Sequence, residues 1–82
     1  MKVKTLANNQ YIITTDKTET FQSYDTFIAQ YNKKTGVTTL NTDYEQSRTT
    51  MKYLVKFLQD DNIKDVRKKV ADKVYKIKDL IK

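Results

Sequence analysis

The sequence predicts an α+β fold in which a four-stranded antiparallel β-meander is followed by two C-terminal helices packed on it. Residues 1–46 hold ten of the twelve threonines, together with tyrosine, phenylalanine, isoleucine and valine, which suit a pleated, half-buried surface. After residue 46, apolar residues recur at helical spacing. A chain of 82 residues is long enough for one domain and too short for two, so residues 1–82 are expected to form a single domain.

The first two strands are predicted at Val3–Ala7 and Gln10–Thr15, on either side of Asn8-Asn9. Asparagine tolerates the positive φ that a tight two-residue hairpin turn demands. A third strand is expected over about Thr20–Tyr31, with a break near Ser23–Asp25, where the apolar and aromatic run is interrupted.

The fourth strand follows the clearest turn in the chain. Residues 32–36 end in the only glycine, Gly36, at the point where a hairpin loop favours a left-handed residue. Val37–Thr42 then returns as the last strand of the meander.

Two helices are predicted in residues 47–82. Ser47 can cap the first, which should run for about eleven residues because Met51, Leu54, Val55 and Leu58 follow at i, i+3, i+4 and i+7 spacing. The polar run at residues 59–62 separates it from the second helix and offers an acidic or amide cap. The second helix is expected from Ile63 to the end of the chain, because its apolar residues average 3.6 positions per turn: Ile63, Val66, Val70, Val74, Ile77 and Ile81.

Composition excludes several mechanisms. The chain has no Cys and no His, which removes disulfides, thiolate nucleophiles, zinc ribbons and the usual general base near neutral pH. We therefore expect no catalysis and no cofactor. Asp43, Glu45 and Lys52 could be drawn as a magnesium-dependent nuclease cluster, but a polar loop before a capped helix is the preferred interpretation. No signal peptide and no membrane-spanning run is apparent, so a cytoplasmic location is expected.

Basic charge is concentrated at the C-terminal end, where residues 63–82 carry eight bases and three acids. The bases are expected to flank the apolar stripe of the last helix, and solubility is the simplest interpretation. Nucleic-acid binding through Lys64, Arg67, Lys68 and their neighbours is the alternative, although acids spaced seven apart oppose it. Membrane binding is disfavoured because the stripe is mostly Val and Ile.

The tyrosines are candidate contact residues. Phe21, Phe27 and Phe57 are expected in the core, whereas a phenol is equally suited to burial or display. Aromatic and arginine side chains are the usual anchors of protein interfaces, so displayed tyrosines near Arg48 would fit partner binding. The candidate partner-binding tyrosines are Tyr24, Tyr31 and Tyr44. For Tyr11 the sequence likewise leaves both burial and display open.

Several short motifs lie along the first 58 residues. They are Ser23-Tyr24-Asp25-Thr26 with Ile28-Ala29 and Tyr31, Thr35-Gly36-Val37 with Leu40, and Tyr44 and Ser47-Arg48-Thr49-Thr50 with Leu54 and Phe57-Leu58. With these motifs the chain resembles a group of small, mostly uncharacterised proteins encoded by phages and plasmids of low-GC Gram-positive bacteria. The resemblance covers about residues 1–58, and the basic last helix lies outside it. Members of that group often have an aromatic-rich stretch where this chain has Glu45-Gln46.

The resemblance implies an accessory protein of a mobile element, a class that includes anti-CRISPR proteins. The expected function is therefore inhibition of a host defence system by binding a CRISPR effector nuclease, or its ribonucleoprotein, in the bacterial cytoplasm. A basic nucleic-acid-binding accessory module is the alternative, and a plain structural protein of the element is a third. A homodimer is also expected to be accessible, because the edges of a small meander are natural pairing sites.

Overall fold

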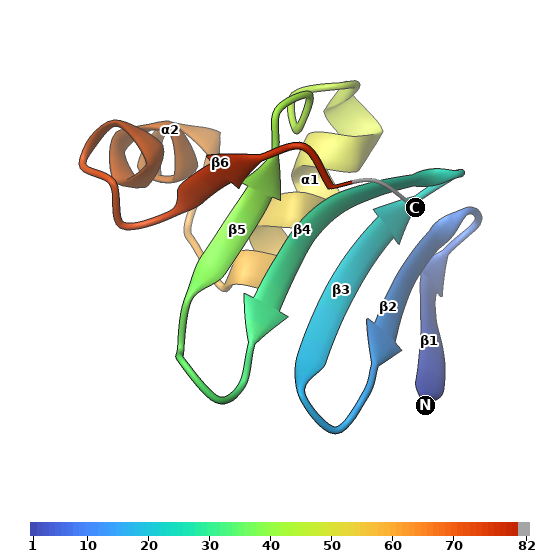
Figure 1. The fold of residues 1–82 in the computed structure, drawn as a ribbon. Helices are drawn as coiled ribbons and strands as arrows, with labels where there is room; N and C mark the ends of the chain where they lie inside the picture. Colours follow the sequence, from blue (N-terminus) through green and yellow to red (C-terminus); the bar gives the residue numbers. More distant parts are fainter. Residues whose placement is uncertain (81–82) are drawn as a thin grey trace.

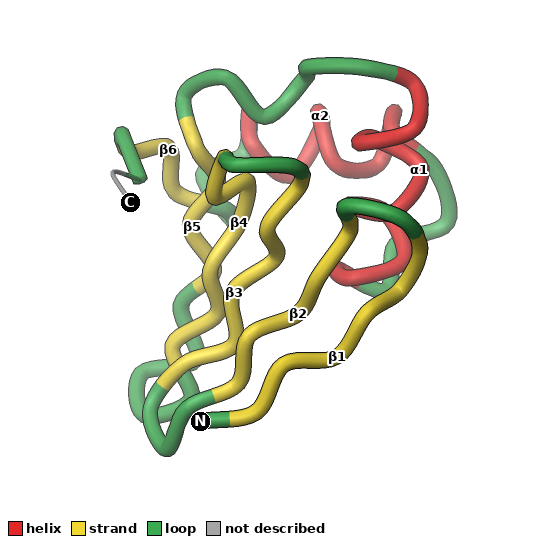
Figure 2. Tube along the Cα trace, turned by 90° about the vertical axis from the view of Figure 1, so that its right-hand side faces the viewer, coloured by secondary structure: helices red, strands yellow, loops and turns green. Residues whose placement is uncertain are grey.

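The computed structural model describes residues 1–80, which form a six-stranded sheet with two helices on one of its faces (Figures 1 and 2). Strand order in the sheet follows chain order, and all neighbours are antiparallel except β5 and β6, which are parallel. The α+β class is confirmed, but the sheet has six strands rather than the four predicted. The elements are β1 (Lys2–Ala7), β2 (Gln10–Thr14), β3 (Thr18–Ser23), β4 (Thr26–Asn32), β5 (Thr38–Asn41), α1 (Arg48–Leu58), α2 (Ile63–Ala71) and β6 (Lys76–Lys78).

One of the two additional strands comes from the predicted third strand, which is a hairpin. The chain reverses at Tyr24-Asp25, between β3 and β4, at the place where the sequence pattern breaks. Two other turns confirm their predictions, because Asn9 has φ 62° between β1 and β2 and Gly36 has φ 72° before β5.

The other additional strand is β6, and it corrects the prediction of a single helix from Ile63 to residue 82. α2 ends at Ala71, and Lys73 adopts a left-handed φ of 61°. The Lys73 N–H donates to the Val70 carbonyl at 3.1 Å and the Val74 N–H to the Lys69 carbonyl at 2.8 Å, which is the Schellman pattern of a helix end. Residues 76–78 then pair with β5, whose connection through both helices permits parallel pairing. The final predicted apolar residue, Ile81, lies outside the described residues.

The core lies between the sheet and the helices. Phe21, Leu40, Leu54 and Val66 are fully buried there, and the ring of Phe57 packs on Phe21 with centroids 5.9 Å apart. The core prediction is confirmed for Phe21 and for Phe57, which is partly buried against the cluster.

Phe27 does not lie in that core, and a bulge in β4 explains why. Phe21 pairs with Ala29 while the next residue of β3, Gln22, pairs with Phe27, so Ile28 is an extra residue in β4. Ile28 and Ala29 are both buried as a result. Phe27 lines a hollow on the opposite, open face of the sheet, beside Leu80.

Candidate binding surface

Two of the sequence motifs meet in the structure through buried hydroxyl groups. The Ser23 and Thr50 hydroxyl oxygens are 2.9 Å apart, and both residues are fully or almost fully buried. The Thr50 N–H donates to the Ser47 hydroxyl at 3.1 Å, which confirms Ser47 as the N-cap of α1. These contacts hold the β3–β4 hairpin against the first turn of α1, so Ser23, Ser47 and Thr50 have a structural role.

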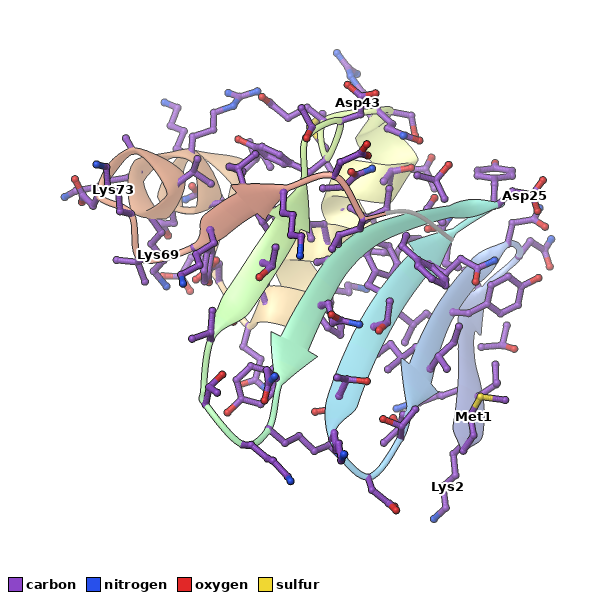
Figure 3. The ribbon with its side chains drawn as sticks, in the orientation of Figure 1. Met1, Lys2, Asp25, Asp43, Lys69 and Lys73 are labelled. Carbon is purple, nitrogen blue, oxygen red and sulfur yellow. The ribbon has the colours of Figure 1, made fainter. Side chains whose placement is uncertain are left out.

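The same two motifs also present exposed side chains next to this junction. Tyr24 follows Ser23 and is 56% exposed, and Arg48 precedes Thr50 by two residues and is exposed. We call Tyr24 and Arg48 the tip surface, because both flank the Ser23–Thr50 contact that joins the hairpin tip to the start of α1. Tyr24 lines a hollow on the open face of the sheet, and Arg48 lines a separate hollow beside α1. Figure 3 shows this end of the molecule at Asp25, the residue after Tyr24.

The backbone at Tyr24 is strained. Its φ of 55° lies in the left-handed region, which a bulky residue adopts at a cost of about 1–2 kcal/mol. Two hydrogen bonds hold it there: the Tyr24 N–H donates to the Asn9 carbonyl at 2.7 Å, and the Gln22 amide donates to the Tyr24 carbonyl at 2.6 Å. An exposed aromatic ring kept in a conformation that suits glycine is a reason to suspect a function for the ring.

A hollow on the open face of the sheet adjoins Tyr24. It has a volume of about 450 Å³, and the side chains of Val3, Tyr11 and Ile13 form its apolar lining. Val3 is 57% exposed, although a valine in a strand would ordinarily be covered. Together with Tyr24, these residues form an aromatic and aliphatic surface that spans β1, β2 and the hairpin tip. Tyr11 is therefore partly displayed, in this hollow.

The remaining candidate residues lie elsewhere. Tyr31 is half-buried in β4 and lines a groove on the helix-covered face, while Tyr44 is only 9% exposed and belongs to the core. Burial raises the pKa of the Tyr44 phenol above its usual value, and the neighbouring Glu45 carboxylate adds to this effect. The expectation that Tyr44 could contact a partner is thus opposed by its position.

The bases of α2 are surrounded by acids. Arg67 donates to the Glu45 carboxylate through Nη2 at 2.5 Å and Nε at 2.8 Å. Lys68 lines a hollow together with four carboxylates, those of Asp60, Asp61, Asp65 and Asp72. Lys64 is exposed on the same helix, which lies at the opposite end of the molecule from the hairpin tip (Figure 3). Lys64, Arg67 and Lys68 therefore do not join the tip surface, and no unbroken basic face forms on α2.

A different basic stripe lies along α1. Arg48, Lys52 and Lys56 are all exposed and four residues apart, so they share one side of the helix. They border a hollow of about 600 Å³ whose apolar lining includes Met51, Val55 and Ile63. The i, i+4, i+8 spacing of these three bases is a signal in the sequence, although the C-terminal segment carries more charge.

The structure also reveals a buried carboxylate that the sequence suggested was part of a polar linker. The Asp60 side chain is 2% exposed and accepts a hydrogen bond from the Tyr75 hydroxyl at 2.8 Å, as well as pairing with the Lys69 ammonium. Burial and the hydrogen bond to Asp60 raise the pKa of Tyr75 to about 12. The hydrogen bond to Asp60 likewise raises the pKa of Lys69. This network joins the α1–α2 connection to the segment that enters β6.

Residues 1–80 contain neither a candidate metal site nor a candidate membrane-spanning helix. No group of three or more His, Cys, Asp or Glu side chains within this part of the chain could hold a metal ion. No helix among the same residues is long and apolar enough to cross a membrane.

Comparison with protein families gives one match. Residues 1–73 match DUF8033, a family of unknown function. The chain belongs to this family. The DUF8033 match extends beyond residue 58, where the sequence motifs end, and includes α2 with the turn at Lys73, so the basic helix is part of the family's domain. No curated protein and no solved structure matches the chain.

Proposed function

We propose that this protein inhibits a host defence system as an accessory protein of a phage or other mobile element. In this proposal it binds a CRISPR effector nuclease in the bacterial cytoplasm and carries out no catalysis. The resemblance of its motifs to phage and plasmid proteins supports the kind of partner. The exposed ring of Tyr24, carried on a strained backbone, supports binding through the tip surface and is the observation on which the proposal rests.

Two features of the tip surface suit a protein interface. Tyrosine and arginine are enriched among interface residues that contribute most to affinity, and the tip surface contains one of each, Tyr24 and Arg48. The apolar hollow beside Tyr24 can receive a side chain of the partner. Hydrogen bonds to its N–H and its carbonyl hold the Tyr24 backbone, so little backbone conformational entropy is lost when it binds.

The charge of the chain limits how such an inhibitor acts. A net charge of +6 is the wrong sign for a mimic of DNA. The protein would therefore occlude a surface of the effector, compete for its guide RNA or alter its assembly.

The experiment begins with capture of the partner from the bacterial host and its identification by mass spectrometry. The purified effector, loaded with guide RNA, is then tested for cleavage of target DNA with an excess of the protein. We expect cleavage to be suppressed by the wild-type chain and restored by Tyr24→Ala or Arg48→Ala. Full cleavage with wild-type protein in excess would refute inhibition, whereas unchanged inhibition by both variants would reject only the site.

Nucleic-acid binding is the second candidate, and the stripe on α1 is the observation that favours it. Arg48, Lys52 and Lys56 could contact successive phosphates of one strand, whereas on α2 Arg67 and Lys69 are paired with carboxylates and Lys68 shares a hollow with four of them. This function predicts micromolar binding to nonspecific DNA or RNA that weakens steeply with salt and is reduced in Lys52→Ala. Binding that does not respond to salt would rule it out.

Self-association remains a separate prediction. β1 is the outer strand of the sheet, and among residues 1–80 no strand pairs with its second edge. Pairing of two copies through β1 would form a homodimer, although it would bring the Lys2 and Lys4 side chains of the two copies near one another. Light scattering distinguishes the 9.7 kDa monomer from a species of twice that mass.

A further inference from the structure

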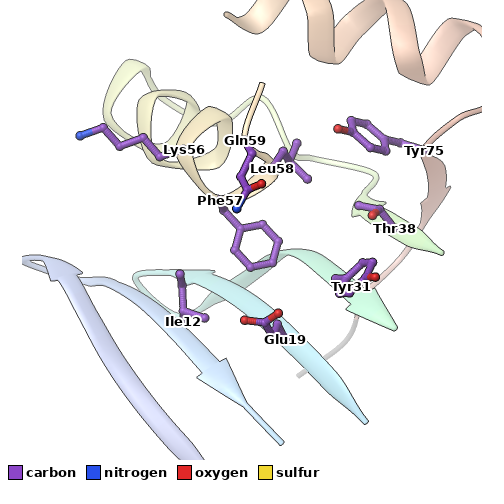
Figure 4. A pocket seen from close by; sticks show the side chains of 9 residues that line it. All are labelled: Ile12, Glu19, Tyr31, Thr38, Lys56, Phe57, Leu58, Gln59 and Tyr75. Carbon is purple, nitrogen blue, oxygen red and sulfur yellow. The ribbon is translucent and has the colours of Figure 1, made fainter. Parts of the chain in front are cut away.

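The groove that Tyr31 lines lies on the helix-covered face of the sheet, under the C-terminal end of α1 (Figure 4). This groove has a volume of about 500 Å³. Aromatic and aliphatic side chains from three parts of the chain contribute five of its nine lining residues. They are Ile12 and Tyr31 from the sheet, Phe57 and Leu58 from α1, and Tyr75 from the segment before β6.

One of the polar residues that line the groove carries a carboxylate. Glu19 is on the sheet side of the groove, where β3 places it opposite Tyr31 (Figure 4). Glu19 is half-buried, and its carboxylate makes no hydrogen bond or ion pair with any of residues 1–80. The side chains of Gln59 and Thr38 also line the groove and likewise have no partner within the described chain. The side chains of Glu19, Gln59 and Thr38 thus leave hydrogen-bond acceptors unused in the groove, and Glu19 adds one negative charge.

The lysines around the groove do not neutralise that charge. Lys56 lines the groove, but its ammonium lies 5.3 Å from the ring centroid of Tyr53 and points away from Glu19 (Figure 4). Lys69 is paired with the buried Asp60 carboxylate, and its ammonium lies 5.6 Å from the centroid of the Tyr75 ring. Among residues 1–80, Glu19 is therefore a groove carboxylate with no cation paired to it, on a chain whose net charge is +6.

We propose that this groove binds the side chain of an arginine on a partner protein. The planar guanidinium stacks on aromatic faces, here those of Tyr31 and Phe57, and its five N–H groups match several acceptors at once. The Glu19 carboxylate supplies the charge-assisted hydrogen bonds, and the aliphatic stem of the arginine lies against Ile12 and Leu58. The site lies at the opposite end of α1 from the tip surface and does not depend on the function proposed above.

The test uses the purified protein alone and the probe acetyl-arginine-methylamide, titrated while NMR shifts of the groove residues are followed. The matched probe acetyl-norleucine-methylamide keeps an aliphatic stem and lacks the charge. We expect the arginine probe to bind at least about fivefold more tightly, because hydrogen bonds to charged groups contribute more than contacts of the stem. Equal binding of the two probes would overturn the proposal.

Variants locate the binding. Glu19→Gln should weaken the arginine probe about tenfold, and Tyr31→Leu about threefold, with the norleucine probe little changed. Asp43→Asn is the matched control, because it removes the same charge from an exposed loop outside the groove and should leave binding unchanged. If Asp43→Asn weakens binding as much as Glu19→Gln, only the net charge matters and the site is refuted. Failure of this test leaves the inhibitor proposal standing, since no effector is present.

Discussion

Removal of the Tyr75 hydroxyl should destabilise the fold at neutral pH and reduce its sensitivity to alkali. In Tyr75→Phe, the Asp60 carboxylate, which is 2% exposed, loses one of its two side-chain partners. Loss of a hydrogen bond to a buried charged group costs about 1.5–3 kcal/mol, so we expect the free energy of unfolding to fall by about 2 kcal/mol at pH 8.

The pH dependence follows from the pKa of Tyr75. It is about 12 in the folded protein and close to 10 in the unfolded chain. As the pH rises through this window the unfolded chain loses its proton first, so the contribution of Tyr75 is fully present below about pH 10 and is lost as the pH approaches 12. Two pKa units correspond to at most about 2.7 kcal/mol, and partial solvent screening lowers the expected loss to about 1–2 kcal/mol.

Urea unfolding followed by circular dichroism from pH 8 to 11.5 measures this effect. The stabilities of the wild type and Tyr75→Phe should converge as the pH rises, because only the wild type loses the contribution of the Tyr75 hydroxyl. Lys69 contributes to the alkaline loss in both proteins. Tyr24→Phe is the control, since it removes an exposed hydroxyl far from Asp60. A gap between wild type and Tyr75→Phe that stays constant across this range would refute the role assigned to the network.

Four other substitutions, in three experiments, test the structure. Lys73→Gly should raise the free energy of unfolding by about 0.5–1 kcal/mol in urea titrations, because glycine adopts the φ of 61° without strain, and a loss of stability would contradict the turn geometry. Gln10→Met should stabilise by about 1 kcal/mol, because both polar atoms of the buried Gln10 amide lack a partner among residues 1–80, and destabilisation would show that the amide is satisfied. Ser23→Ala and Thr50→Val should each cost about 1 kcal/mol, and a double-mutant cycle should give a coupling of about 0.5–1.5 kcal/mol, whereas additive effects would exclude the hydrogen bond between them.

Local signals predicted the elements that depend on local chemistry. Asn9 and Gly36 stand at positions of positive φ, and the sequence identified both turns because these residues tolerate that conformation. Ser47 and Asn62 cap the two helices through hydrogen bonds to the backbone three residues ahead. Each of these features is decided within a few residues of the chain.

The end of α2 could not be predicted in this way. The apolar spacing through Val70, Val74 and Ile77 continues the helical period, and the left-handed residue that stops the helix is Lys73 rather than glycine. Tertiary contacts decide the outcome instead: Tyr75 is buried and bonded to Asp60, and Ile77 pairs with Leu40 of β5. Tertiary structure overrides local propensity here.

The candidate site divides along the same line. The display of Tyr24 and Arg48 could be expected from their residue types, but the junction of the two segments that carry them depends on the Ser23–Thr50 contact, which joins residues 27 positions apart. The burial of Tyr44 and the pairing of Arg67 with Glu45 depend on residues distant in sequence, so neither could be predicted from local spacing. Partner binding through Tyr44 and the bases of α2 stays a prediction. The Glu19 groove had no sequence signal, since β3, α1 and the segment before β6 supply its walls.

Tyr24→Gly tests the role of the Tyr24 ring in binding most directly, with Lys73→Gly as the matched control. Both substitutions place glycine at a positive φ, and both should leave the fold as stable as the wild type or more so. We expect Tyr24→Gly to weaken binding to the captured host effector at least about tenfold, as loss of a central interface residue does. Lys73→Gly should bind like the wild type. Equal binding by both variants would show that the ring is not the contact and would contradict the central claim.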